Sequence, residues 1–267
     1  MRNNLLFLAL IILSSCVSYT EKKTENEKKI ETTKEISNIL TNKKDTSDAT
    51  IEMKKFLMGK FKVNEHAKFV LVDKKYHNKR ELYLQKEVLG AFIEMHKSAK
   101  KDGINLTIIS GTRDFYSQKR IWERKFNTNK SKGISNIENI KKIMIWSAMP
   151  TTSRHHWGTE IDINGFEEYF NGKNEKSNKE YKWLTNNAHK FGFCQVYTKK
   201  KGEKQSGYNE EKWHWSYMPL SSYYLKKYKE LITYTDINGF SGSEFAKELD
   251  IIKRFVLTIE QECKSVF

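Results

Sequence analysis

The spacing of hydrophobic positions predicts several helices in the chain after residue 50. Between Leu84 and Lys101 the apolar residues recur at helical spacing, and Asp102 and Gly103 follow as a stop signal. The same pattern predicts further helices over 114–126, 136–146, 180–191, 221–231 and 242–254. Shorter segments with a different period separate these helices.

Those shorter segments predict strands. Residues 159–163 alternate strictly, which places Ile161 and Ile163 on one face and Glu160 and Asp162 on the other. Other short strands are expected at 69–72, 104–109, 193–197 and 213–215. Helices and short strands that do not alternate regularly along the chain favour an α+β fold.

The first sixteen residues have the pattern of an export signal. An apolar run from Leu5 to Leu13 follows a short positive start, and it is too short to span a bilayer as a mature helix. The run ends in Leu-Ser-Ser-Cys at Cys16, which resembles the lipobox of bacterial lipoproteins, whose cysteine becomes the lipidated first residue. We therefore expect an exported lipoprotein of the bacterial cell envelope, at the periplasmic face or in the outer membrane, held by a lipid anchor at Cys16. Ordinary secretion, with cleavage near Cys16, is the alternative.

The composition changes twice along the chain and so predicts its domains. After the signal peptide, residues 17–50 are rich in Glu, Lys, Thr, Asn, Ser and Asp, with no aromatic residue after Tyr19. Such a segment buries too little apolar surface to offset the entropy of ordering, so it is predicted to be a flexible polar tether. Aromatic and β-branched residues then continue through 51–267 without an internal repeat, which predicts one folded domain.

The formal net charge of +15 does not by itself indicate a nucleic-acid-binding protein. Lys and Arg are spread along the chain without a nucleic-acid-binding motif, which is typical of a solvated surface. A basic surface suits anionic wall polymers or phospholipids equally well. Together with the export signal, this leads us to expect no nucleic-acid partner.

Two further cysteines lie in the predicted domain, at Cys194 and Cys263. In an exported protein they can form a disulfide, and the alternative is two buried thiols. The sequence does not set their separation in space, so both alternatives are open at this stage.

Two clusters of potential metal ligands lie far apart in the sequence. The first contains His155 and Asp162, and the second contains Glu211 and His214. On one helix, residues seven apart are separated by about 10.5 Å along the axis, which is too far to share a metal ion. The chain must therefore reverse between His155 and Asp162, and Gly158 is the residue that turns most easily.

Successive side chains of a strand point to opposite faces of the sheet, a rule called strand parity below. It predicts where the side chains of both clusters point. If the segment at 213–215 is a strand, Trp213 and Trp215 face one side and His214 faces the other. Two histidines and one carboxylate leave a fourth position for water, which is the catalytic rather than the structural pattern of zinc sites. Glu211 lies three residues before His214 and is placed to take a proton from that water.

The clusters resemble the zinc motifs of the VanY-type D-alanyl-D-alanine carboxypeptidase family. The motif Ser-x-His-x-x-Gly-x-x-x-Asp is present at 153–162, and Glu-x-Trp-His is present at 211–214. A strand-end Ser-Gly-x-Arg followed by Gln matches 110–113 and Gln118. The resemblance extends from about Phe56 to Cys263. It implies the fold shared with the hedgehog signalling domain, a small antiparallel sheet flanked by helices.

The same resemblance implies roles for individual residues. One zinc ion per chain would be bound by three ligands: His155, Asp162 and His214. Glu211 would be the general base, and Arg113 would hold the developing oxyanion or the substrate carboxylate. Ser153 and Gln118 would line the substrate pocket.

The sequence departs from the family pattern beside the ligands. Arg154 and His156 stand where many relatives have Glu and Gln, and Lys212 stands where Pro is common. These changes remove no ligand, so they bear on substrate preference rather than on metal binding. His156 is a competing ligand, although only His155 has the family spacing to Asp162.

The leading functional prediction is a zinc-dependent carboxypeptidase, of the D-alanyl-D-alanine or the L,D-carboxypeptidase type. It would remove terminal D-alanine from peptidoglycan stem peptides, with a metal-bound water activated by Glu211. One alternative is a peptidoglycan endopeptidase of the same fold. Another is a non-catalytic, lipid-anchored wall-binding module, which would have no need of Glu211. The sequence gives no indication of the oligomeric state.

Overall fold

A computed structural model describes residues 46–172, 174–199 and 207–265, and the chain divides into two units after Ile51. Cys16 and residues 17–45 of the predicted tether lie outside the described residues. Residues 46–50, which were expected to belong to the tether, are helical. In the described part of the chain, no helix has the length and hydrophobicity needed to cross a membrane.

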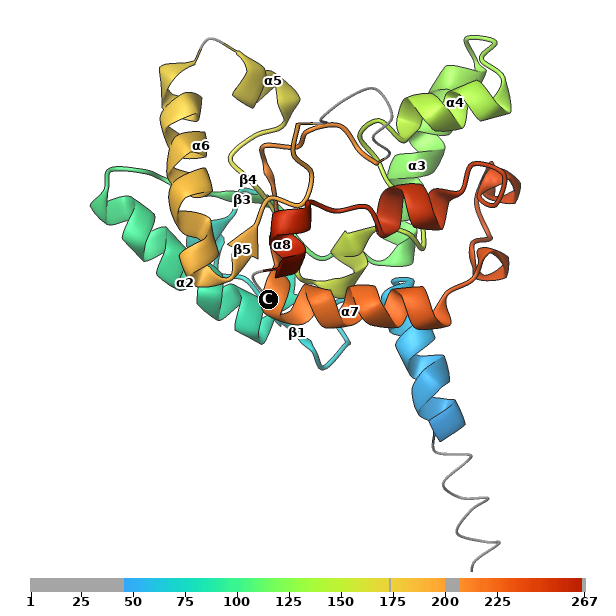
Figure 1. The fold of residues 1–267 in the computed structure, drawn as a ribbon, viewed down its shortest axis with the longest axis horizontal. Coiled ribbons are helices and arrows are strands. Elements are labelled where there is room, and N and C mark those ends of the chain that lie inside the picture. Colours follow the sequence, from blue (N-terminus) through green and yellow to red (C-terminus); the bar gives the residue numbers. More distant parts are fainter. Residues whose placement is uncertain (1–45, 173, 200–206, 266–267) are drawn as a thin grey trace, which may run out of the picture. The chain divides into compact units, whose positions relative to one another are not determined.

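A four-stranded antiparallel sheet lies at the centre of the second unit (Figure 1), and its strand order is β3-β4-β6-β5. The strands are β3 (Ile108–Ser110), β4 (Glu160–Ile163), β5 (Phe193–Cys194) and β6 (His214–Tyr217). In the central pair, Ile161 lies opposite Trp215 and Asp162 lies opposite His214. A separate hairpin pairs β1 (Phe69–Leu71) with β2 (Tyr83–Gln85).

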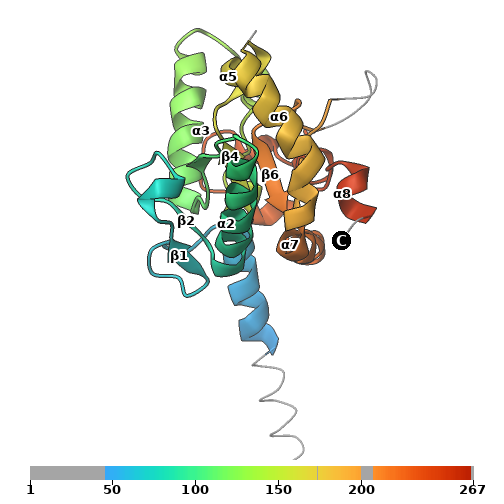
Figure 2. The ribbon, with the colours of Figure 1, turned by 90° about the vertical axis from the view of Figure 1, so that its left-hand side faces the viewer.

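Helices flank this sheet. They are α2 (Lys86–Lys101), α3 (Phe115–Lys130), α4 (Asn136–Ile143), α5 (Glu167–Asn171), α6 (Glu175–Asn187), α7 (Met218–Leu231) and α8 (Gln261–Ser265). Figure 2 shows α2 and α6 side by side over one face of the sheet. The architecture confirms the α+β prediction.

The hydrophobic face of the sheet explains why β4 and β6 are central. Ile161 and Ile163 of β4 and Trp215 of β6 are buried in one cluster with Phe92 of α2 and Leu184 of α6. Neighbouring side chains on a strand point to opposite faces, so Asp162 and His214 must point the other way. Burial of the apolar side chains on one face of the sheet therefore also sets the direction in which Asp162 and His214 point on the other face.

A second hydrophobic cluster packs α3, α4, α7 and α8 together. It contains Trp122 of α3, Ile140 of α4, Tyr228 of α7 and Val256 near the C-terminus. Cys194 of β5 and Cys263 of α8 form a disulfide, which decides between the two alternatives for these cysteines.

Several predicted elements are shorter than expected. The strand predicted at 104–109 is confined to β3, and the one at 193–197 is confined to β5. The helix predicted over 242–254 is broken into short 3₁₀- and π-helical segments, because Asp250 adopts a positive φ of 49° that interrupts an α-helix. The helix predicted from Leu84 begins at Lys86, because Leu84 pairs with Val70 in the hairpin.

Candidate metal and catalytic site

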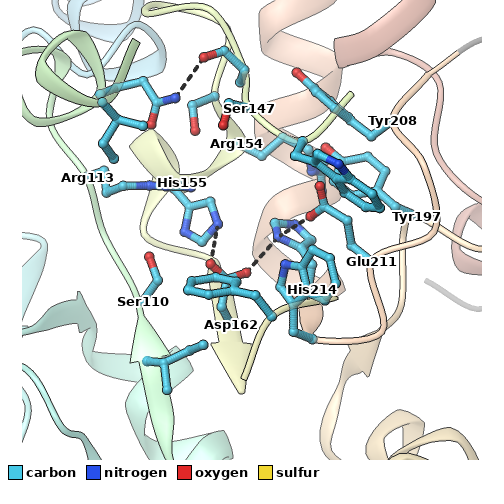
Figure 3. Close-up of a pocket in the computed structure, with 18 of the residues that line it drawn as sticks. Ser110, Arg113, Ser147, Arg154, His155, Asp162, Tyr197, Tyr208, Glu211 and His214 are labelled. Carbon is cyan, nitrogen blue, oxygen red and sulfur yellow. Dashed lines mark hydrogen bonds and ion pairs between the residues drawn. The ribbon is translucent and has the colours of Figure 1, made fainter. Parts of the chain in front are cut away.

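Three side chains from separate segments meet on the polar face of the sheet (Figure 3). His155 comes from the 3₁₀-helix η2 (Arg154–Trp157), Asp162 from β4 and His214 from β6. One ligand atom from each lies within 4.8 Å of the other two, and all three side chains are buried. The structure thus brings together the three residues predicted to be ligands.

The chain reversal between His155 and Asp162 occurs at Gly158, as predicted. Gly158 ends the 3₁₀-helix with φ 68° and ψ 21°, in the left-handed region that favours glycine. A Cβ atom at this position would lie 2.4 Å from Cε1 of Phe69. The turn therefore requires glycine for both its backbone angle and its lack of a side chain.

The ring of His155 is oriented by a backbone carbonyl. Its Nδ1 atom lies 2.8 Å from the carbonyl oxygen of Gly111, and its Nε2 atom lies 3.5 Å from Oδ2 of Asp162. Because a carbonyl oxygen only accepts hydrogen bonds, Nδ1 carries the proton. The lone pair of Nε2 is then directed towards Asp162.

The ring of His214 is held between two carboxylates. Its Nδ1 atom lies 3.1 Å from Oδ1 of Asp162, and its Nε2 atom lies 2.9 Å from Oε2 of Glu160. Burial alone would lower the pKa of His214, but the hydrogen bonds to Asp162 and Glu160 raise it to about 10. A metal ion and a proton compete for Nδ1, while Nε2–H donates to Glu160 in either case.

Asp162 is ionised between these two rings. Its burial acts to raise its pKa, but the charges and hydrogen bonds of His155 and His214 hold the pKa well below the usual range. Two imidazole nitrogens and one carboxylate oxygen are a donor set that zinc accepts, with a fourth position left for water or substrate. The residues present therefore fit the predicted metal.

His156, the competing ligand, points elsewhere. It is fully buried, and its Nδ1 atom donates to the carbonyl oxygen of Arg113 at 2.6 Å. Burial lowers the pKa of His156 to about 4, so the ring is neutral at pH 7. It does not belong to the ligand cluster, and His155 is the histidine that meets Asp162.

Glu211 lies beside the ligand cluster without belonging to it. Its Oε2 atom is 3.7 Å from Nδ1 of His214, and its side chain is 8% exposed. Burial raises the pKa of Glu211 to about 8, with Asp162 acting in the same direction and His214 in the opposite one. A carboxyl group with such a pKa can accept a proton and return it near neutral pH.

Arg113 supplies the positive charge of the site. It lies just after β3, and in the described part of the chain its buried Nε atom has no hydrogen-bond partner. Burial lowers its pKa, and the carboxylates of Asp162 and Glu211 act in the opposite direction. The guanidinium is therefore available to an anionic group that enters the site.

A cavity of about 620 Å³ opens onto these residues, and Ser153 and Gln118 line it together with the ligands. Gln118 donates from Nε2 to the carbonyl oxygen of Ala148 at 2.7 Å. Its Oε1 atom is buried without a partner among the described residues. Both predicted pocket residues thus lie in the wall of the cavity, and their roles stay predictions.

Sequence reasoning missed Glu160 and the residues that hold it. Arg154 donates to Ser216 at 2.8 Å and lies 3.1 Å from Oε1 of Glu160, with both charged side chains buried. Burial would raise the pKa of Glu160, but Arg154 and His214 lower it to about 2. The signal was present in the alternating pattern, because Glu160 shares the polar face of β4 with Asp162.

Arg154 thus has a contact that the sequence did not indicate, with Glu160. The sequence linked it to substrate preference, which stays a prediction because Arg154 also lines the cavity. The structure in addition buries it against Glu160 and places its guanidinium 4.7 Å from the centroid of the Trp157 ring. Two aromatic residues of the cavity wall were also missed, Tyr197 and Tyr208. The Tyr197 ring lies 4.9 Å from the ring of His214.

Trp213 was expected to face the core with Trp215, and this is wrong. Trp213 precedes β6, so strand parity does not govern it. It lines the cavity and packs against Trp146, with 5.6 Å between ring centroids. Trp215, inside the strand, does lie in the core.

Sequence comparison relates the chain to known proteins. The profile of the VanY family, described as D-alanyl-D-alanine carboxypeptidase, matches residues 81–220. The chain is 30% identical over 129 residues to a D-alanyl-D-alanine carboxypeptidase of Enterococcus faecalis, covering 48% of this chain and 46% of that protein. It is 33% identical over 142 residues to the putative carboxypeptidase YodJ of Bacillus subtilis, covering 51% of this chain and 46% of that protein. The chain thus matches a little under half the length of these relatives.

Solved structures resemble the chain more distantly. A crystal structure of the vancomycin-resistance D,D-pentapeptidase VanY in complex with Zn(II) has 24% sequence identity and a TM-score of 0.45, covering 63% of this chain and 94% of that chain. The structure of the LD-carboxypeptidase LdcB has 24% sequence identity and a TM-score of 0.45, covering 66% of this chain and 81% of that chain.

Proposed function

The chain belongs to the VanY family of D-alanyl-D-alanine carboxypeptidases, and from this premise we propose that it is a zinc-dependent carboxypeptidase that removes terminal D-alanine from peptidoglycan stem peptides. The observation that carries the proposal is the position of Glu211. A buried carboxyl group lies 3.7 Å from a nitrogen of the ligand cluster, yet it is not one of the ligands. A structural metal site has no use for such a group, whereas hydrolysis requires one.

His155, Asp162 and His214 would hold the metal. Zinc, when bound, lowers the pKa of water and polarises the scissile carbonyl. Glu211 accepts a proton from the attacking water on a carboxylate oxygen. It then delivers this proton to the nitrogen of the departing D-alanine.

Arg113 would stabilise negative charge on the substrate. Its guanidinium lines the same cavity as Glu211 and Asp162, and its Nε–H has no partner in the described part of the protein. A planar cation can bind the terminal carboxylate of a peptide or the oxyanion that forms during attack. Preference for a free carboxylate would distinguish a carboxypeptidase from an endopeptidase.

A hydrolysis assay with defined peptides tests the proposal. Purified protein is incubated with tetrapeptide and pentapeptide stems, and the products are weighed by mass spectrometry. We expect the loss of one alanine, inhibition by a chelator and recovery with added zinc. The variant Glu211→Gln should retain its zinc content and lose turnover by about 10²–10⁴-fold. Release of an internal fragment would instead indicate an endopeptidase, and zinc binding without any hydrolysis would indicate a wall-binding module.

We also propose that the protein is a lipoprotein of the bacterial cell envelope. The support is the apolar run from Leu5 to Leu13 and the Leu-Ser-Ser-Cys motif that ends at Cys16, in a part of the chain outside the described residues. Replacing Cys16 by Ala should abolish labelling with a radioactive fatty acid and release the protein from the membrane fraction. Unchanged membrane association of Cys16→Ala would contradict the lipid anchor.

A further inference from the structure

A second hollow of about 270 Å³ opens beside the active-site cavity. The two share Arg124, Lys125 and Trp146 as lining residues. The other residues of this groove lie on α3 or α4: Thr128, Asn129, Lys142 and Ile143. We call these seven residues the basic groove, because three of them are cations and none is acidic.

The cations of the basic groove have no carboxylate partner in the described part of the chain. Nζ of Lys125 donates to Oγ of Ser147 at 2.5 Å, which is a neutral partner. Neither Arg124 nor Lys142 forms an ion pair with a described residue, whereas the adjacent Lys141 lies 2.9 Å from Glu138. The groove thus holds three cations without a described carboxylate partner, whereas Lys141 beside it is paired with Glu138.

Lys125 is the cation most affected by this arrangement. It is half-buried between the groove and the cavity. Burial lowers its pKa, and Arg124 and then Arg113 act in the same direction, with Glu211 opposing them. An anion in the groove would relieve both the repulsion among these cations and the missing solvation of Lys125.

Two of the residues that line the groove are apolar. They are Ile143 and Trp146, and Trp146 packs on Trp213 of the main cavity. A lining of cations and apolar side chains suits a free carboxylate carried by a peptide chain. Arg113 and Lys125 line the same cavity, so positive charge extends from the catalytic centre to the groove.

We propose that the basic groove binds a free carboxylate of the stem peptide, on a residue that precedes the scissile bond. The inference rests on the proposed function, because the proposed function is what places the C-terminal end of the peptide beside Glu211 and Arg113. It adds a preference: acidic stems, with a free carboxylate upstream, would be better substrates than amidated stems of the same length.

The test compares two pentapeptide stems that differ in one group. The second residue is either D-glutamate, with a free α-carboxylate, or D-isoglutamine, with an amide. For the unsubstituted protein we expect kcat/KM to be higher for the acidic peptide, and the ratio to fall with added salt. Lys125→Ala should reduce the ratio about tenfold through KM, because it removes a charge-assisted hydrogen bond. Lys142→Ala should reduce it less.

Lys141→Ala is the matched control. It removes a lysine from the same helix as Lys142, but one that is paired with Glu138 and lies outside the groove. It should leave the ratio unchanged. Equal rates for the two peptides, or an equal loss on both peptides in Lys125→Ala, would overturn the proposal.

A binding measurement separates this proposal from the proposed function. Binding of both peptides to Glu211→Gln is followed by Trp fluorescence, because Trp146 lies in the groove. Tighter binding of the acidic peptide that is lost in Glu211→Gln/Lys125→Ala would support the groove even if no peptide is hydrolysed. Hydrolysis of both peptides with equal affinity would leave the function standing and overturn the groove.

Discussion

Oε2 of Glu160 lies 2.9 Å from Nε2 of His214, on the side of the ring opposite Asp162. This hydrogen bond keeps the proton on Nε2 and leaves Nδ1 to face the other ligands. Carboxylates in this position commonly fix the tautomer of a metal-binding histidine and raise its basicity. Glu160 is therefore a positioning residue for the candidate metal site.

Replacing Glu160 by Gln should weaken zinc binding. The amide oxygen can still accept the hydrogen bond, but it lacks the charge that raises the basicity of the ring. We expect zinc affinity to fall about 10–100-fold, as is typical of such outer carboxylates. Competition with a chromophoric chelator measures the affinity, and cobalt substitution reports the ligand geometry through its visible spectrum.

A control for this variant is available elsewhere in the chain. Glu180 is equally buried and accepts a hydrogen bond from Tyr169 at 2.7 Å, outside the site. Glu180→Gln should lower stability without changing zinc affinity or the cobalt spectrum. If both variants lose affinity alike, the effect of Glu160 is general destabilisation and its positioning role is wrong.

Arg154 neutralises Glu160 in a buried ion pair. Arg154→Met leaves the carboxylate without its cation, and breaking a buried pair in this way costs about 3–5 kcal/mol. Arg154→Met/Glu160→Gln removes both charges and should recover much of that loss. Urea unfolding of the two single variants and the double variant measures the coupling. Additive losses would show that the pair does not stabilise the fold.

The pKa values of Glu211 and His214 predict how the metal-free protein responds to pH. Glu211 has a folded pKa of about 8 against an ordinary value of 4.5, and His214 has about 10 against 6.5. Both groups bind protons more tightly in the folded state. Their stabilising contribution is therefore lost as pH rises, from about pH 4.5 to 8 for Glu211 and from about 6.5 to 10 for His214.

The free energy of unfolding should accordingly decrease between pH 6.5 and 8, where both groups act in the same direction. Glu211 accounts for about 1–2 kcal/mol of that decrease, at about 1.4 kcal/mol per pH unit for one proton. Urea unfolding after removal of metal measures it. Glu211→Gln should flatten the profile, whereas the neighbouring Glu210→Gln should not. An unchanged slope in Glu211→Gln would contradict the raised pKa.

The disulfide should contribute substantially to stability. Cys194 and Cys263 are 69 residues apart in sequence, and a closed loop of this length restricts the unfolded chain. We expect reduction to cost about 2–4 kcal/mol, seen as a lower Tm in the presence of a phosphine reductant. In Cys194→Ala/Cys263→Ala the reductant should have no effect on the Tm. A reductant-sensitive Tm in that double variant would show that the loss has another origin.

The sequence predicted the ligand geometry because two local rules were sufficient. The spacing between His155 and Asp162 required a reversal at Gly158, and strand parity separated Asp162 from the isoleucines of β4. The structure has both features. These rules depend only on neighbouring residues, so a sequence contains all that they need.

The features of the site that the sequence did not predict depend on contacts between segments that are distant in the chain. Glu160 and His214 are 54 residues apart, and Arg154 and Ser216 are 62 apart, so no local pattern joins them. Trp213 was misplaced because the first residue of β6 is His214, a boundary set by pairing with β4. Element ends and partners of buried charges are thus settled by tertiary structure.

Gly158 offers a test of the reversal that forms the site. Gly158→Ala places a Cβ 2.4 Å from Phe69 and keeps a positive φ of 68°, which costs an L-residue about 1–2 kcal/mol before any steric effect. We expect a lower Tm and weaker zinc binding, because Asp162 follows the turn. Gly90→Ala is the matched control: it lies in α2 with nothing within 4 Å of the new Cβ. Alanine there should raise stability by about 0.5–1 kcal/mol and leave zinc affinity unchanged. Normal zinc affinity in Gly158→Ala would show that the site does not depend on this turn.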